Sequence, residues 1–191
     1  MTKSDRLRRL ESECHKCVRC GIGGKVLFGG HLSNVFSNMC MKARIMVVGQ
    51  NPGRVEVERG RPFVGESGRF FDGVVLDVLG VDRSTFYICN AVRCHTPGNR
   101  PPTASEIENC RSFLDEEIAI VEPELVVTLG GFGLKQVTGL SGIRKRHGEK
   151  IISLRYKVPV IPLLHPSPLN MNKKENREIF REDVAALREY L

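Results

Sequence analysis

The chain has 191 residues, of which 41% are hydrophobic and 27% charged, and its 29 basic and 22 acidic side chains give a net charge of +7. These values are typical of a globular protein and exclude a wholly disordered chain. No stretch approaches the roughly 20 apolar residues that a membrane span needs, and no apolar run follows the basic N-terminus as in a secretory signal. We therefore expect an intracellular, cytoplasmic protein, and the positive charge favours a polyanionic partner such as nucleic acid.

Four short apolar segments are predicted to be buried strands, at 44–48, 86–91, 125–129 and 159–164. They are nearly continuous in apolar residues, which is typical of strands covered on both faces. Helical patterns lie between and after them, and the one at 103–121 begins with TASE, a capping-box sequence. The other helices are predicted at 67–79, 131–138 and 175–190.

This alternation of strands and helices predicts an α/β fold with three layers, in which helices cover both faces of a mostly parallel, four-stranded sheet. We expect residues 1–191 to form a single domain, on which a cysteine-bearing segment of about forty N-terminal residues is docked. Ligands of such sheets bind beyond the carboxyl ends of the strands. Three loops are therefore candidates for a site, and their sequences are GQNPG, CNAVRC and LHPSPLN.

The first of these loops belongs to a longer segment, 49–68, that contains five glycines and two prolines. This composition predicts irregular backbone rather than helix or sheet. Glycine at Gly49 and Gly53 would let the backbone approach a ligand closely, because no Cβ stands in the way.

Seven cysteines in a reducing compartment favour free thiols or metal ligands over disulfides. Cys14 and Cys17 form a C-x2-C pair, which is a common start of a metal site. Cys94 follows a strand and Cys110 lies in the next helix, so a folded loop could bring both near that pair. Four thiolates allow either a zinc site or an iron–sulfur cluster, and the spacing does not choose. Cys20 forms a second C-x2-C pair with Cys17 and could shift the ligand set.

Taken together, these segments resemble the uracil-DNA glycosylase superfamily, most closely the iron–sulfur branch often called family 4. The resemblance is carried, in this order, by CHKC, GQNPG, GRPFVGESG, CNAVRCHTPGNRPPTASEIENC, LVVTLGG and HPSPLN. It implies a uracil-DNA glycosylase-like fold and a monofunctional DNA repair enzyme that flips uracil out of DNA and hydrolyses its N-glycosidic bond. It also implies a [4Fe–4S] cluster on Cys14, Cys17, Cys94 and Cys110. DNA would be the partner, the nucleoid the location and a monomer the expected state.

The resemblance further implies two catalytic residues and three that contact DNA. Asn51 would orient the attacking water, and His165 would donate a hydrogen bond to uracil O2, where negative charge develops. Gly53, Ser167 and neighbouring backbone amides would contact DNA, and Leu169 would wedge into the gap that the extruded nucleotide leaves. From the residues alone, a lone histidine is usually structural, and Leu169 could simply pack on the domain.

Four residues are implied to bind the base. Phe63 would stack on the flipped uracil and Asn90 would pair with its edge, because one amide offers both an acceptor and a donor. Gly49 would allow close approach and Gln50 would contact the base through its backbone. Without the resemblance, a strand-end asparagine that satisfies a turn would be the preferred interpretation of Asn90. An aromatic residue such as Phe63 usually belongs to the core, but the Gly, Pro and Arg residues around it disfavour burial under a helix.

The first motif departs from the iron–sulfur branch, which usually carries Glu-Ala where this chain has Gln50-Asn51. GQNPG resembles instead the mismatch-specific and single-strand-selective relatives, so hypoxanthine, xanthine or mismatched thymine could be substrates besides uracil. One competing hypothesis is a non-catalytic iron–sulfur protein that binds nucleic acid or senses redox state, and another is a zinc-held nucleic-acid module. Asn51 together with His165 argues for catalysis, because a protein that only binds could dispense with both.

Overall fold

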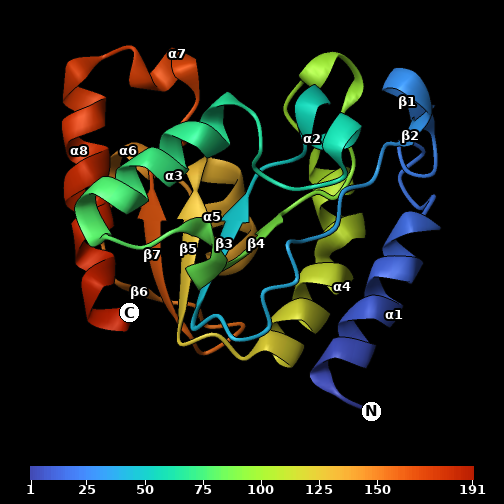
Figure 1. Cartoon of the computed structure of the whole chain (residues 1–191), viewed down its shortest axis with the longest axis horizontal. Helices are drawn as coiled ribbons and strands as arrows, with labels where there is room; N and C mark the ends of the chain where they lie inside the picture. Colours follow the sequence, from blue (N-terminus) through green and yellow to red (C-terminus); the bar gives the residue numbers. More distant parts are fainter.

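The computed structural model describes residues 1–191 and contains a central five-stranded sheet in the order β4-β3-β5-β7-β6 (Figure 1). The four expected strands are present as β3 (Ile45–Gly49), β4 (Phe86–Asn90), β5 (Leu125–Leu129) and β7 (Pro159–Leu163), and they are parallel. The prediction of four strands was wrong by one, because β6 (Ile151–Ile152) pairs antiparallel with β7. A strand of two residues is too short to carry a recognisable pattern.

The parallel strands are buried on both faces, as their continuous apolar sequences predict. Successive side chains of a strand point to opposite faces of a sheet. In β3, Ile45 and Val47 belong to one hydrophobic cluster, whereas Met46 and Val48 belong to another. Two separate cores therefore lie on the two faces of one sheet.

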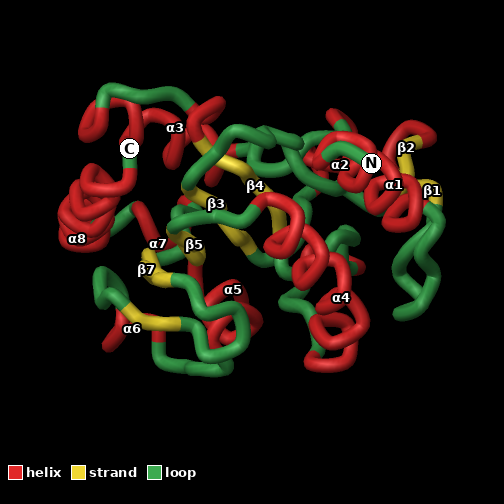
Figure 2. The backbone as a smooth tube through the Cα atoms, turned by 90° about the horizontal axis from the view of Figure 1, so that it is seen from below, coloured by secondary structure: helices red, strands yellow, loops and turns green.

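Helices cover both faces, which gives the expected three-layer α/β architecture (Figure 2). α3 (Glu66–Leu79) and α8 (Lys174–Ala185) pack on one face. The other face is covered by α1 (Lys3–His15), α4 (Ala104–Val121) and α5 (Gly130–Thr138). None of these helices is both long and apolar enough to cross a membrane.

The four predicted helices begin within one residue of their expected starts, and α4 has the capping box, in which the side chains of Thr103 and Glu106 each accept a hydrogen bond from the other residue's backbone N–H. The last helix ends earlier than expected, since a 3-10 helix follows at Ala186–Tyr190. The segment 49–68 is not wholly irregular as predicted, because α2 (Arg54–Arg59) lies inside it. The remaining elements are short: β1 (Val26–Leu27), β2 (His31–Leu32), α6 (Ile143–Arg146) and α7 (Pro168–Met171).

The first forty residues lie along one side of the sheet structure. α1 packs beside α4 (Figure 1), and the β1–β2 hairpin contacts α2. Asn34 forms an isolated bridge with Cys94, and its side chain also donates to the carbonyl of Cys14, 2.9 Å away. These contacts connect the N-terminal segment to the chain that leaves β4.

The direction in which successive strands are added to the sheet reverses between β3 and β5. The chain passes from β3 to β4 on one side of this point, and from β5 to β7 on the other. In open α/β sheets the crevice for ligands lies at such a point, beyond the carboxyl ends of the strands. Gly49 and Asn90 end their strands here, and His165 follows β7 closely.

Candidate active site

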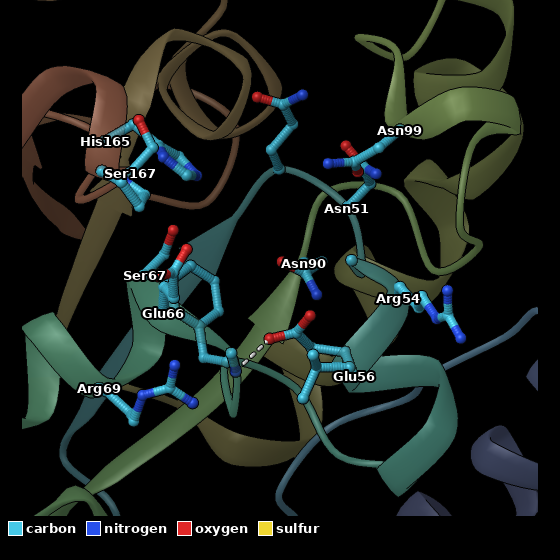
Figure 3. Close-up of a pocket in the computed structure, with 16 residues that line it drawn as sticks. Asn51, Arg54, Glu56, Glu66, Ser67, Arg69, Asn90, Asn99, His165 and Ser167 are labelled. Atoms are coloured by element: carbon cyan, nitrogen blue, oxygen red, sulfur yellow. Dashed lines mark hydrogen bonds between the residues drawn. The ribbon is translucent and has the colours of Figure 1, made fainter.

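A pocket of about 510 Å³ opens at these strand ends, a size typical of small-molecule sites (Figure 3). Figure 3 shows Asn90 near the centre, with His165 and Ser167 on one side and Asn51 and Asn99 on the other. Most of the predicted site residues therefore face one cavity. The lining consists of Gln50, Asn51, Gly53, Arg54, Val55, Glu56, Phe63, Gly65, Glu66, Ser67, Arg69, Asn90, Asn99, His165, Ser167 and Pro168.

The ring of Phe63 forms part of the wall, and its centroid lies 6.4 Å from that of His165 at an interplanar angle of 45°. The backbone of Phe63 is left-handed, with φ +52°, which is an uncommon conformation for a residue with a side chain. Arg83 stabilises it, because its guanidinium donates to the carbonyls of Pro62 and Phe63, each 2.8 Å away. On the other side of this turn, Glu56 Oε1 accepts from the backbone N–H of Gly65 at 2.7 Å.

Gly49 lies directly behind the pocket rather than in its lining. A Cβ at this position would lie 2.2 Å from Phe63 Cε2 and 2.5 Å from Asn90 Oδ1. Both contacts are far too short, so any other residue at position 49 would displace Phe63 or Asn90. The predicted close approach at Gly49 is thus between parts of the protein itself.

Asn90 is only 1% exposed, yet neither its Oδ1 nor its Nδ2 has a hydrogen-bond partner in the protein. An unpaired buried polar group costs about 1–3 kcal/mol, so native proteins rarely tolerate one without a reason. Because the side chain of Asn90 lines the pocket, its donor and acceptor are available to a molecule bound there.

His165 is partly buried beside Gly130, whose φ is +83° and at which a Cβ would lie 3.0 Å from His165 Cβ. Asn170 Nδ2 donates to the carbonyl of His165 at 3.0 Å and fixes the backbone there. Removal of the ring from water lowers the pKa of His165 to about 4. The imidazole is therefore neutral at pH 7 and can still donate one hydrogen bond.

Asn51 lies on the opposite wall, and its Nδ2 donates to the carbonyl of Pro52 at 3.2 Å and to Thr96 Oγ1 at 3.3 Å. Gln50 borders both this pocket and a smaller adjoining one of about 200 Å³. Its carbonyl accepts from the N–H of Val92 at 2.9 Å, so this carbonyl already has a partner within the protein.

The lining of the pocket includes residues of both charges, and it includes Ser167, the N-cap of α7. Arg54 and Arg69 bring positive charge, while Glu56 and Glu66 bring negative charge. Leu169, two residues further along α7, is 81% exposed and lies outside the lining. Leu169 therefore projects into solvent next to Pro168, which does line the pocket.

Several known proteins are similar in sequence to this chain over most of its length. Residues 36–188 match the family described as the uracil DNA glycosylase superfamily. The chain belongs to this superfamily. A type-4 uracil-DNA glycosylase of Sulfurisphaera tokodaii is 33% identical, over 97% of this chain and 84% of its own length. A type-4 enzyme of Thermotoga maritima is 34% identical, over 100% of this chain and 97% of its own length. A type-5 uracil-DNA glycosylase of Pyrobaculum aerophilum is 37% identical, over 69% of this chain and 65% of its own length.

The four cysteines of the predicted ligand set come from distant parts of the chain and lie near one another, and Cys20 lies among them. Cys14, Cys94 and Cys110 are buried, while Cys17 is partly buried. Burial, and then the neighbouring thiols of Cys110, Cys20, Cys14 and Cys17, raise the pKa of Cys94 above its usual value. No three His, Cys, Asp or Glu side chains are grouped so as to hold a metal ion.

Two sulfur atoms of this group have N–H donors nearby. Asn34 Nδ2 lies 3.4 Å from Cys94 Sγ, and Arg19 Nε lies 3.2 Å from Cys17 Sγ. Such donors stabilise thiolates that bind a metal or a cluster. The chemistry of these donors therefore fits a thiolate-bound group.

Several residues that shape the site carry no recognisable signal in the sequence. Arg83 is 20 residues from Phe63 and Thr96 is 45 residues from Asn51, so no local spacing connects them. Glu56 lies in the glycine-rich segment 49–68, but no spacing connects it to Val64 and Gly65, from whose N–H groups it accepts.

Proposed function

We propose that this protein is a uracil-DNA glycosylase, which binds an extruded uracil and hydrolyses the bond between uracil N1 and deoxyribose C1′. The observation that carries this proposal is the amide of Asn90, buried and without a partner, in one pocket with Phe63 and His165. The ring of Phe63 would stack on the base, as aromatic rings do with unpaired bases. Enzymes that act on a base in a duplex reach it by extruding the nucleotide from the stack.

Recognition of the base would come from the edge that uracil presents to Asn90. Uracil N3–H donates and O4 accepts, so both groups of one amide are satisfied together. Cytosine presents the reverse pattern, because its N3 accepts and its N4 donates. An Asn90 amide held in the orientation that pairs with uracil would leave its oxygen and nitrogen unpaired against cytosine, at about 1–3 kcal/mol each. Thymine, hypoxanthine and xanthine also present an N–H beside a carbonyl, and together with the unusual Gln50-Asn51 sequence this supports a broadened range of deaminated or mismatched bases.

In the reaction, the oxygen of a water molecule bonds to C1′, and the electrons of the C1′–N1 bond leave with uracil. Neutral His165 would donate to uracil O2, where part of this negative charge appears. Asn51 would orient the water, and since an amide does not ionise, the released proton ends on solvent or on uracil N1. The lining contains no lysine that could form a Schiff base, which supports a monofunctional enzyme.

Leu169 would contact the DNA, and its exposure supports the role of a wedge. Leu169→Ala is expected to slow excision from double-stranded DNA by about tenfold or more, because partial unstacking of a duplex costs a few kcal/mol. Excision from a single strand, where no stack must open, should change little. The measurement is the ratio of single-turnover rates on the two substrates, and equal losses on both would contradict the wedge.

We also propose that Cys14, Cys17, Cys94 and Cys110 hold a [4Fe–4S] cluster. Each thiolate of such a cluster binds a different iron, so its ligands surround a volume rather than a single point. The four thiols lie near one another but do not form a site for a single metal ion, which is compatible with ligands spread around a cluster. Similarity to type-4 enzymes supports the proposal. When bound, the cluster would supply cross-links between α1, the loop after β4 and α4.

Cys94→Ser is expected to abolish the visible absorption of the purified protein and lower its melting temperature, because a thiolate ligand is lost. Cys40→Ser is the matched control, since Cys40 Sγ donates to the carbonyl of Ser84 and lies apart from the four thiols. Iron and acid-labile sulfide are measured in all three proteins. Zinc in place of iron in the wild type would contradict the cluster.

The proposed activity is tested with oligonucleotides that differ only in one base, which is uracil, hypoxanthine, xanthine, thymine or cytosine opposite each partner. After incubation, alkali cleaves the abasic sites, and an untreated sample reports any lyase step. We expect strand cleavage of the uracil substrates only after alkali. DNA binding without release of any base would instead support the non-catalytic alternative.

A further inference from the structure

Thr96 stands out among residues near the pocket because it contacts Asn51 without lining the cavity. It is 0% exposed, and its Oγ1 lies 3.3 Å from Asn51 Nδ2. The hydroxyl of Thr96 also donates to the backbone carbonyl of Arg100. The side chain of Asn51 is thus connected to the loop after β4 through one buried hydroxyl.

These contacts determine which end of the Asn51 amide faces the protein. A hydroxyl has a single hydrogen, and that of Thr96 is used on the carbonyl of Arg100. Towards Asn51, Thr96 Oγ1 can therefore only accept. The second partner is the carbonyl of Pro52, which can also only accept. The NH₂ group must face both of them, and Asn51 Oδ1 is left without a protein donor.

A neighbouring contact fixes the backbone of the same loop. His95 Nδ1 lies 2.9 Å from the carbonyl of Pro52, and since a carbonyl cannot donate, Nδ1 carries the hydrogen. His95 is buried, and its ring packs edge-on against Phe28 with centroids 5.1 Å apart. His95 therefore positions the backbone of the loop, while Thr96 positions the side chain of Asn51.

We propose that Thr96 is a positioning residue, which turns the Asn51 amide so that its oxygen, rather than its nitrogen, meets the attacking water. The proposal rests on the function proposed above. Water attacks through a lone pair on its oxygen, so a useful partner must accept one of its hydrogens. An amide turned the other way would donate to that lone pair and oppose the attack.

The test compares Thr96→Val, which removes the hydroxyl but keeps the shape, with Thr96→Ser, which keeps the hydroxyl. Thr128→Val is the matched control, because Thr128 Oγ1 is buried in β5 without a partner. We expect Thr96→Val to lower the single-turnover rate on uracil-containing duplex by roughly 10- to 100-fold, with Kd for the abasic duplex unchanged. Thr96→Ser and Thr128→Val should keep rates close to that of the wild type.

A double variant separates positioning from general damage to the fold. With Asn51→Ala already present, Thr96→Val should cause no further loss of rate, because the group that it positions is absent. Full activity of Thr96→Val, or an equal loss in both backgrounds, would overturn the proposal.

A second readout does not require activity. In ¹H–¹⁵N spectra, the side-chain NH₂ signals of Asn51, assigned by their absence in Asn51→Ala, should shift in Thr96→Val and not in Thr128→Val. Unchanged signals would overturn the hydrogen bond and with it the inference. If the signals shifted as expected but the wild type released no base, the proposed function would be refuted while the contact itself was supported.

Discussion

Replacing His165 by alanine is expected to lower the single-turnover rate of uracil excision by about 10²–10³-fold, the usual effect of removing one donor to a developing anion. The physical reason is that the departing uracil carries negative charge on O2, and the neutral imidazole would stabilise this charge by donating a hydrogen bond. DNA affinity should change little, because this contact strengthens only as the bond breaks. His31→Ala, an exposed histidine on β2, is the control. A variant without His165 that kept the wild-type rate would remove the histidine from the mechanism.

The same substitution should change how stability depends on pH. In the folded protein the pKa of His165 is lowered to about 4, below its ordinary value of 6.5. Between these values the unfolded chain binds the proton more readily, so protons favour unfolding, and the free energy of unfolding falls as the pH falls from 6.5 towards 4. His165→Ala should lose this contribution. Urea unfolding at pH 7 and pH 5 measures it, and an equal pH dependence in both proteins would contradict the lowered pKa.

Asn90→Leu is expected to change stability and activity in opposite directions. Leucine has nearly the shape of asparagine but no polar atoms, so the substitution removes two buried groups that lack partners. The free energy of unfolding should rise by about 1–3 kcal/mol, while uracil excision should fall at least about 100-fold because both hydrogen bonds to the base are lost. Urea unfolding and single-turnover excision assays give the two quantities.

Asn38 provides a matched comparison for this second prediction. Its Nδ2 donates to the carbonyl of Phe86 at 2.7 Å, and its Oδ1 accepts from the N–H of Ile88 at 2.8 Å, so both of its groups are paired along β4. Asn38→Leu should therefore destabilise the protein and leave the chemistry of the pocket intact. If Asn90→Leu destabilised the protein as much as Asn38→Leu, then Asn90 would have partners in the free protein and would not be available to a base.

Local sequence patterns were sufficient to predict the main strands and helices and the end of the sheet where the site lies. Strands such as 125–129 are nearly continuous in apolar residues, and α4 begins at its capping box, because both signals act within a few residues. The convergence of Asn90 and His165 followed from a general rule for parallel sheets. Their proposed roles came from resemblance, since the residues alone favoured a structural asparagine and gave the histidine no specific role.

The contacts that hold the site could not be predicted in the same way. The turn at Phe63 is stabilised by Arg83, and the amide of Asn51 by Thr96, across separations that no periodicity encodes. Helix α2 was missed because glycines at both of its ends dominated the composition of its segment. Such contacts depend on the three-dimensional path of the chain. They form only when distant segments have come together in the folded protein.

The exit from β4 places a thiol, an imidazole and a hydroxyl in three consecutive residues, Cys94, His95 and Thr96. Cys94 belongs to the cysteine group. His95 is hydrogen-bonded to the carbonyl of Pro52, and Thr96 is hydrogen-bonded to the side chain of Asn51. An extended chain advances only about 3.3–3.6 Å per residue, so Cys94 and Thr96 are at most about 7 Å apart along the chain. We therefore expect oxidation of Cys94 to displace His95 and Thr96 first, and with them the side chain of Asn51, before the rest of the fold is lost.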